Sequence, residues 1–376
     1  MKPKTSRTIG YFSSFFFLGT VIAILGPTLP ALAENLGVKP TDLGYIFSVR
    51  SLGYLAGSLL GGYLYERIRG HRVMAAALVL AALTLFLTPL DHLLILLIIS
   101  LFFTGLGLGS LDIGSNTMLS TLYGDDSGPY LNSMYLLAGL GSFSAPLLIR
   151  ALSVRWGYWA LGILGLAVSG WLLGTPSPFP QKETSPEADD VSHLPTLLLF
   201  CLLSFLFIGI EISYGGWIFT YFRAQNLGAE TAAYTLTSLF YLSITVGRLL
   251  SIPVSTALKP SWNVFGLLFG GAVSTGLMLA YPRQPWSIWI GTSGMGLSLS
   301  ALFPTTFHYI RESFSLKTSS YGTVWASGSL GGILIPWVMG EVVDSGGPVS
   351  LMAITSLAWG LALAVFALLA LRKRVS

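Results

Sequence analysis

The second half of this 376-residue chain repeats the first half at an offset of about 190 residues. Four short glycine-containing segments recur in the same order. The pairs are 15–19 with 205–209, 57–60 with 247–250, 105–108 with 294–297, and 140–146 with 330–336. An internal repeat of this length in an apolar chain is typical of a transporter built from two parallel bundles, with its binding site between them. The repeat therefore predicts both a fold and the region in which to look for a site.

Composition places the repeated halves in a membrane. Hydrophobic residues make up 53% of the chain and charged residues only 10%, and the mean hydropathy is +0.72. Apolar runs long enough to cross about 30 Å of hydrocarbon recur throughout. We predict an all-α integral membrane fold of two parallel six-helix repeats, with twelve transmembrane helices at residues 8–33, 41–65, 72–90, 93–122, 130–152, 154–173, 196–224, 229–257, 259–281, 285–312, 318–343 and 347–371.

One polar segment interrupts the apolar pattern. Residues 174–195 hold several prolines and then acidic residues, a composition that does not form a buried core. We therefore predict an N-terminal six-helix bundle at 1–173, a cytoplasmic linker at 174–195 and a C-terminal six-helix bundle at 196–376.

Basic residues set the expected orientation. With the N-terminus in the cytoplasm, thirteen Lys and Arg residues lie on the cytoplasmic side and five on the outer side. Loops rich in Lys and Arg stay in the cytoplasm. We predict a multi-pass protein of the plasma membrane, or bacterial inner membrane, with both termini cytoplasmic. The apolar run near the N-terminus is too long for a secretory signal and is expected to be the first helix.

Motifs of soluble enzymes are absent from the sequence. The run Gly105-Leu-Gly-Leu-Gly109 lacks the preceding strand and the spacing of a nucleotide-binding loop. Glycines four residues apart, as in Gly53, Gly57 and Gly61, instead allow close approach of membrane helices. We expect no enzymatic activity, no metal site, no cofactor and no nucleic-acid partner.

The segment 62–72 reads Gly-Tyr-Leu-Tyr-Glu-Arg-Ile-Arg-Gly-His-Arg. It resembles the Gly-x-Leu-x-Asp-Arg-x-Gly-x-Arg loop of the major facilitator superfamily, with Glu66 for Asp and one extra residue before the second glycine. In that family the charges of this loop hold the cytoplasmic ends of the two halves in one conformation. The resemblance implies a conformational latch formed by Glu66, Arg67 and Arg72; the alternative is charge that only sets the topology.

Three charged residues fall inside predicted membrane helices. Asp112, Glu211 and Arg50 lie near the middle of their helices, where a charge is costly and usually marks a transport pathway. Their partners in the other half of the repeat are apolar, so the charges are additions to a symmetric scaffold. We predict that these three residues couple transport to an ion, H⁺ or Na⁺. The alternative is structural ion pairing, such as Arg50 with Asp112 or Glu211.

Amide and aromatic side chains lie close to these charges in the sequence. Asn116 shares a helix face with Asp112 by i, i+4 spacing. Sugars present C–H faces for aromatic rings to stack on and hydroxyls for amides and carboxylates to bind. We predict substrate contacts from Asn116, Asn132, Tyr135, Tyr214, Trp217 and Trp325. The alternative for the aromatic residues is a place in the interfacial belts or facing lipid.

Two segments carry a more specific resemblance. Residues 211–221 resemble helix 7 of the sodium-dependent glucose transporter-like group of the superfamily, and 112–116 are similar to the helix-4 segment of the fucose–proton symporter family. The resemblance implies that Asp112 takes part in proton-coupled sugar transport. The acid on the first helix of the fucose symporter has no counterpart, since residues 10–32 hold no acid.

We therefore expect a monomeric secondary active transporter in the lipid bilayer. It would move a monosaccharide or similar small polar solute by alternating access. The alternative is an exporter of lipophilic compounds or lysolipids by proton antiport, because residues 139–146 loosely resemble the glycine- and proline-rich motif of antiporters. A nutrient sensor or a membrane enzyme is a third reading, and the short loops argue against it.

Overall fold

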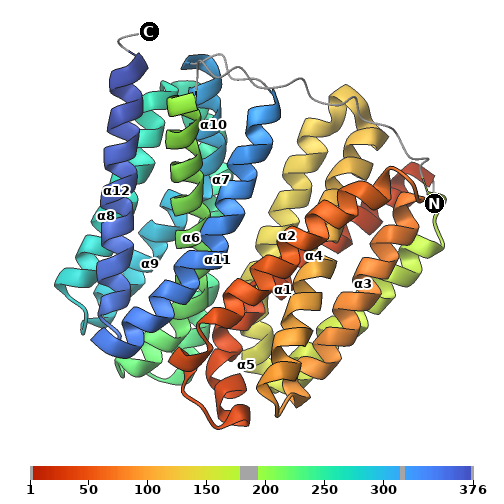
Figure 1. Cartoon of the computed structure of the whole chain (residues 1–376), viewed down its shortest axis with the longest axis horizontal. Coiled ribbons are helices and arrows are strands. Elements are labelled where there is room, and N and C mark those ends of the chain that lie inside the picture. The colour runs from red at the N-terminus through yellow and green to blue at the C-terminus, as the bar shows by residue number, and fades with distance from the viewer. Residues whose placement is uncertain (1–2, 178–193, 314–317, 374–376) are drawn as a thin grey trace. The chain divides into compact units, whose positions relative to one another are not determined.

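The computed structural model describes residues 3–177, 194–313 and 318–373, and their regular elements are helices (Figure 1). The chain divides into two compact units, Met1–Glu183 and Thr184–Ser376. This boundary falls within the segment predicted as the linker, most of which lies outside the described residues.

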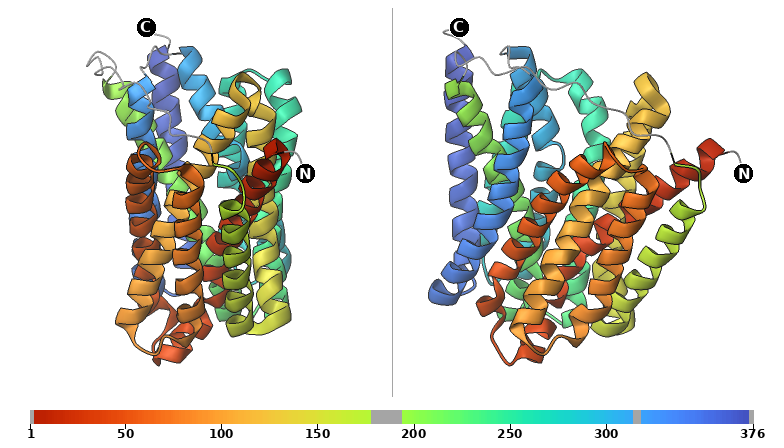
Figure 2. Two further views of the ribbon diagram at one scale, coloured as in Figure 1. Left: turned by 90° about the vertical axis from the view of Figure 1, so that its right-hand side faces the viewer. Right: turned by 45° about the vertical axis from the view of Figure 1, so that its right-hand side comes forward.

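The first unit contains five long helices and three short 3₁₀ turns, with the long helices lying side by side (Figure 2). Its elements are α1 (Pro3–Leu36), η1 (Pro40–Leu43), α2 (Tyr45–Tyr65), α3 (Gly70–Leu87), η2 (Thr88–Leu90), α4 (Leu94–Tyr123), η3 (Gly124–Asp126) and α5 (Ser127–Leu173). The second unit consists of α6 (Leu194–Ala224), α7 (Glu230–Ala257), α8 (Pro260–Ala280), α9 (Pro285–Ser300), α10 (Leu302–Ser313), α11 (Thr318–Gly346) and α12 (Ser350–Lys373).

Nine apolar helical stretches among the described residues are long enough to cross a membrane. One of them, Leu94–Leu173, holds α4 and the whole of α5. The helix α5 is kinked at Ser153, whose φ of 68° and ψ of 169° are not helical, so that it consists of two helical arms. The two arms of α5 match the predicted spans 130–152 and 154–173. With the pair α9–α10 as the remaining crossing, the predicted all-α fold of twelve transmembrane helices is confirmed.

The predicted span 285–312 is divided into two helices at Ala301. The cause is Pro304, which has no N–H to donate to the carbonyl of Ser300 and whose ring clashes with that carbonyl in a continuous helix. Arg248 of α7 donates its Nε–H to the Ser300 carbonyl at 3.4 Å instead. The break is therefore compensated by a side chain from a neighbouring helix.

The repeat in sequence is a repeat in packing. In the first unit α1 packs on α5, and in the second α6 packs on α11. A Cβ atom at Gly141 of α5 would collide with the carbonyl of Phe16 on α1, and one at Gly331 of α11 would collide with the carbonyl of Phe205 on α6. Glycine is thus required at equivalent positions because the two backbones touch.

The first residues after α5 pack against the first unit. Arg7 of α1 donates to the carbonyl of Pro176 at 2.7 Å, and the ring of His71 lies 3.1 Å from the carbonyl of Thr175. His71, one residue before the predicted span 72–90, is a buried residue of the first turn of α3 and also contacts the hydroxyl of Tyr11 at 2.8 Å. The start of the predicted linker is therefore held by α1 and α3.

Candidate functional site

A chain of hydrogen-bonded side chains links three helices of the first unit around Asp112. Tyr54 of α2 donates its hydroxyl to Oδ2 of Asp112 on α4 at 2.5 Å. Asn116, one turn further along α4, donates its amide to Oδ1 of Asp112 at 2.9 Å. Tyr135 of α5 donates its hydroxyl to Oδ1 of Asn116 at 3.3 Å. Three predicted site residues, Asp112, Asn116 and Tyr135, are thus brought together.

The close contact of α2 and α4 makes the bond between Tyr54 and Asp112 possible. A Cβ at Gly105 would collide with the carbonyl of Arg50, and one at Gly109 would collide with the carbonyl of Tyr54. The predicted role of the glycines at four-residue spacing is therefore confirmed. Because the two backbones touch, a phenol on α2 reaches a carboxylate on α4.

The ring of Tyr135 is fixed from a fourth helix. Phe15 of α1 packs edge to face against this ring at a centroid distance of 5.2 Å. Asn132 lies one turn before Tyr135 on α5 and is exposed. The predicted role of Asn132 in substrate binding stays a prediction.

Arg50 is placed by α1. Its Nη1 atom lies 2.9 Å from the carbonyl of Ile22 and 3.4 Å from that of Val21. Asp112, one of the acids considered as its ion-pair partner, accepts hydrogen bonds from Tyr54 and Asn116. A guanidinium on backbone carbonyls favours a role for Arg50 in joining α1 to α2.

The second unit holds the second predicted acid. Glu211 lies mid-way along α6, and the charge of Arg248 on α7 acts on its carboxylate. Arg248 is also the donor to the Ser300 carbonyl at the break between α9 and α10. Half-buried Arg248 is therefore linked both to the acid and to the broken helix.

Two aromatic residues that follow Glu211 are buried inside the second unit. The hydroxyl of Tyr214 lies 2.7 Å from the hydroxyl of Thr292 on α9, and its ring is fully buried. The indole of Trp217 is 1% exposed and donates to the carbonyl of Pro336 on α11 at 3.3 Å. These contacts tie α6 to its neighbours, and the predicted substrate contacts of both residues stay predictions.

The remaining predicted residues are at exposed positions. Trp325 of α11 is 54% exposed and packs on Phe303 of α10 at a centroid distance of 4.6 Å. Glu66 and Arg72 are exposed near the turn between α2 and α3. The guanidinium of Arg67 lies 3.5 Å from the centroid of the Tyr63 ring, a cation–π contact.

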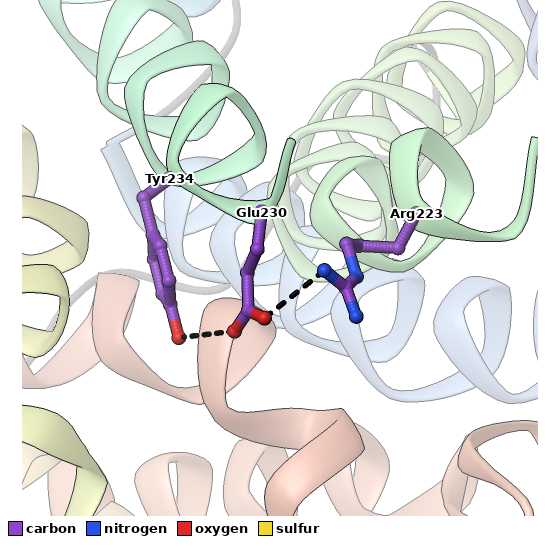
Figure 3. A network of polar contacts seen from close by, with 3 residues as sticks. All are labelled: Arg223, Glu230 and Tyr234. Atoms are coloured by element: carbon purple, nitrogen blue, oxygen red, sulfur yellow. Dashed lines mark hydrogen bonds and ion pairs between the residues drawn. The ribbon is translucent and has the colours of Figure 1, made fainter. Parts of the chain in front are cut away.

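A small polar network closes the turn between α6 and α7 (Figure 3). Arg223 at the end of α6 pairs with Glu230 at the start of α7 at 3.0 Å. The hydroxyl of Tyr234 donates to the other carboxylate oxygen at 3.3 Å. Both charged side chains are about half exposed, so this network fixes a surface turn.

Tyr54 is the member of this hydrogen-bonded group that the sequence prediction did not include. Its position one turn after Arg50 was visible, and the spaced glycines on both segments indicated close helix contacts. The sequence did not show that these two glycine-bearing helices pack against each other, and that pairing is what brings Tyr54 to Asp112.

Comparisons with known proteins agree on one family. The model of the Major Facilitator Superfamily matches residues 11–336. The chain is 28% identical over 372 residues to the sodium-dependent glucose transporter 1A of Mus musculus, with 88% of each chain covered. It is 26% identical to the sodium-dependent glucose transporter 1 of Homo sapiens, covering 87% of this chain and 72% of the human protein.

Solved structures share the fold at low sequence identity. The nucleoside transporter NupG matches with a TM-score of 0.77 at 14% identity, over 98% of this chain and 99% of that chain. The POT family transporter PepTSo matches with a TM-score of 0.77 at 14% identity, over 100% of this chain and 99% of that chain. Identities this low show a common fold and leave the substrate open.

Proposed function

The chain belongs to the Major Facilitator Superfamily, and we propose that it carries a monosaccharide or related polyol across the membrane by alternating access, coupled to H⁺ or Na⁺. It is a multi-pass membrane transporter of a small-molecule solute. The names of the mouse and human relatives support glucose or a similar sugar as that solute.

One observation carries the sugar proposal. The chain Tyr54–Asp112–Asn116–Tyr135 places a carboxylate, an amide and two phenols in the membrane-embedded part of the first unit. Such groups bind hydroxyls by hydrogen bonds and stack on the C–H faces of a sugar ring. Asp112 is the acid to which we assign coupling, because a carboxylate inside a membrane helix is costly to place and changes its charge by taking up one proton.

Uptake into proteoliposomes tests the proposal. Labelled glucose and fucose are offered with an imposed pH gradient, with a sodium gradient, or with neither. Accumulation above equilibrium under one gradient identifies a symporter and its ion together. Uptake that stops at equilibrium indicates a uniporter. If neither sugar enters while a lipophilic dye is moved under a proton gradient, the exporter alternative replaces this proposal.

The variant Asp112→Asn tests the assignment of coupling. It keeps the size of the side chain but removes the ionisable group. We expect uphill accumulation to be lost while exchange of labelled for unlabelled sugar continues. Concentration of sugar by Asp112→Asn to the level of the unmodified protein would show that Asp112 is not the coupling acid.

The proposal extends to location and conformation. We infer a monomer in a plasma or bacterial inner membrane, with both termini in the cytoplasm. A fluorescent protein fused to the C-terminus tests the position of that terminus, because many fluorescent proteins fluoresce only in the cytoplasm. We assign Glu66, Arg67 and Arg72 to a latch that stabilises one conformation of the transport cycle. Accessibility labelling of a Glu66→Gln variant tests this, with a changed balance of inward- and outward-open states expected.

A further inference from the structure

The carboxylate of Asp112 receives a hydrogen bond on each oxygen. Tyr54 donates to Oδ2 at 2.5 Å and Asn116 donates to Oδ1 at 2.9 Å. An ionised carboxylate has acceptors only, so the amide of Asn116 has to turn its NH₂ group toward Asp112. Its carbonyl oxygen Oδ1 is then left on the other side, where the Tyr135 hydroxyl lies at 3.3 Å.

We propose that Tyr54 is a positioning residue of the transport site. Tyr54 holds Oδ2 of Asp112, so that Oδ1 is free to accept from the amide NH₂ of Asn116. The side-chain carbonyl of Asn116 then faces the ligand as a hydrogen-bond acceptor. A ligand group that replaces the Tyr135 hydroxyl at this carbonyl therefore has to be a hydrogen-bond donor. The nature of that ligand, a sugar hydroxyl, rests on the proposed function, whereas the role of Tyr54 does not.

The surroundings of Tyr54 direct its phenol. The Tyr54 carbonyl accepts from the hydroxyl of Ser58 at 2.9 Å and faces Gly109 on α4 without room for a side chain between. The backbone at this point of α2 is thus fixed against α4. From this fixed backbone the side chain of Tyr54 reaches the carboxylate of Asp112, and the hydrogen bond to Oδ2 holds its ring there.

Tyr65 provides a matched control on the same helix. It is 4% exposed, and its hydroxyl also crosses from α2 to α4, where it donates to the carbonyl of Ser110 at 2.9 Å. Removing this hydroxyl breaks a bond between the same two helices but leaves the hydrogen bonds of Tyr54 and Asn116 to the carboxylate in place. A purely structural role for both tyrosines predicts the same result for Tyr54→Phe and Tyr65→Phe.

Infrared spectroscopy tests the position of the carboxylate without any substrate. The carboxylate band of Asp112 is assigned by subtracting the spectrum of Asp112→Asn. We expect Tyr54→Phe to shift this band and Tyr65→Phe to leave it in place. An unmoved band in Tyr54→Phe, or an equal shift in Tyr65→Phe, overturns the proposal. If Tyr54→Phe does not fold, Tyr54→Met removes the same donor with a flexible side chain and must give the same shift.

Transport provides the second readout once the sugar is identified. Loss of one charge-assisted hydrogen bond in the network predicts a KM about tenfold higher in Tyr54→Phe. The maximal rate should change by less than about twofold, because the binding geometry is altered and not the conformational cycle. A lower maximal rate at unchanged KM contradicts the positioning role.

A fluorinated sugar sharpens the same test. Fluorine in place of a hydroxyl accepts hydrogen bonds weakly and does not donate them. We therefore expect fluorine at one particular ring position to weaken binding of the sugar to the unmodified protein. Tyr54→Phe should lose this preference, and a preference that persists overturns the proposal. If no sugar is carried, the sugar assignment fails while the infrared comparison still decides the role of Tyr54.

Discussion

Gly109 of α4 lies against the backbone carbonyl of Tyr54 on α2, with no space for a Cβ atom between them. This contact sets the distance between the two helices at the level of the site. Three residues further along α4 is Asp112, which the Tyr54 hydroxyl reaches at 2.5 Å. Glycine at position 109 is therefore needed both for the packing of α2 against α4 and for the hydrogen bond from Tyr54 to Asp112.

The variant Gly109→Ala tests this dependence. The added methyl group forces α2 and α4 apart, which should destabilise the protein by about 1–3 kcal/mol. Gly62→Ala on α2 is the control, because a Cβ there meets nothing within 4 Å. Thermal unfolding in detergent measures both. A midpoint for Gly109→Ala equal to that of Gly62→Ala would contradict the proposed contact.

The sequence predicted the fold well because its signals are local. The length of the apolar runs predicted the spans, and the boundary between spans 130–152 and 154–173 falls at Ser153, where α5 turns. The break at Ala301 was not predicted, although Pro304 is visible in the sequence, because prolines elsewhere, such as Pro27 in α1 and Pro336 in α11, lie inside continuous helices. Whether a proline bends or divides a helix depends on neighbours that are distant in sequence.

The candidate site was predicted in part for the same reason. Asp112 and Asn116 are one helical turn apart, so their bond follows from local spacing. The contacts of Asp112 with Tyr54 and of Asn116 with Tyr135 join residues 58 and 19 positions apart, and depend on which helices pack together. The hydrogen bonds of Arg50 to α1 carbonyls likewise depend on how α1 and α2 pack together.

The surface network of Figure 3 should matter little to stability. Arg223 and Glu230 are 46% and 51% exposed, and exposed pairs of this kind contribute about 0.2–1 kcal/mol. We expect Glu230→Gln to lower the unfolding midpoint slightly at low salt and not at high salt, with transport unchanged. Glu34→Gln, at another exposed acid, is the control. A large loss of transport in Glu230→Gln would assign this turn a functional role.

Asp91 should make stability depend on pH. It lies between η2 and α4, is 7% exposed, and its Oδ2 has no hydrogen-bond partner among the described residues. Burial raises the pKa of this carboxyl above its ordinary value, while Ser100 and His92 lower it by less. Because the folded state holds the proton more tightly than the unfolded state, stability is lost as the pH rises through the folded-state pKa.

The variant Asp91→Asn removes this ionisation. We expect its unfolding midpoint to exceed that of the unmodified protein near neutral pH and above. Below the pKa of Asp91 in the unfolded state, this carboxyl is protonated in the folded and the unfolded protein alike. The higher unfolding midpoint of Asp91→Asn should therefore vanish at such a pH. Asp125→Asn, at an exposed aspartate of η3, should show no such trend. An advantage for Asp91→Asn that is the same at acid and neutral pH would exclude ionisation as its cause.

The break between α9 and α10 links a proline to a half-buried cation. Pro304 cannot donate to the Ser300 carbonyl, and Arg248 donates to it at 3.4 Å while its charge acts on Glu211. We expect Arg248→Met to destabilise the protein by about 1–3 kcal/mol, because it leaves the carbonyl without its donor and Glu211 without its cation.

Adding Pro304→Ala restores an N–H for Ser300, and adding Glu211→Gln removes the uncompensated charge. Each second change should therefore recover part of the loss. Unfolding free energies in mixed micelles, arranged as double-mutant cycles, measure the recovery. If Arg248→Met costs the same with Pro304→Ala as without it, then Arg248 acts on Glu211 alone and not on the broken helix.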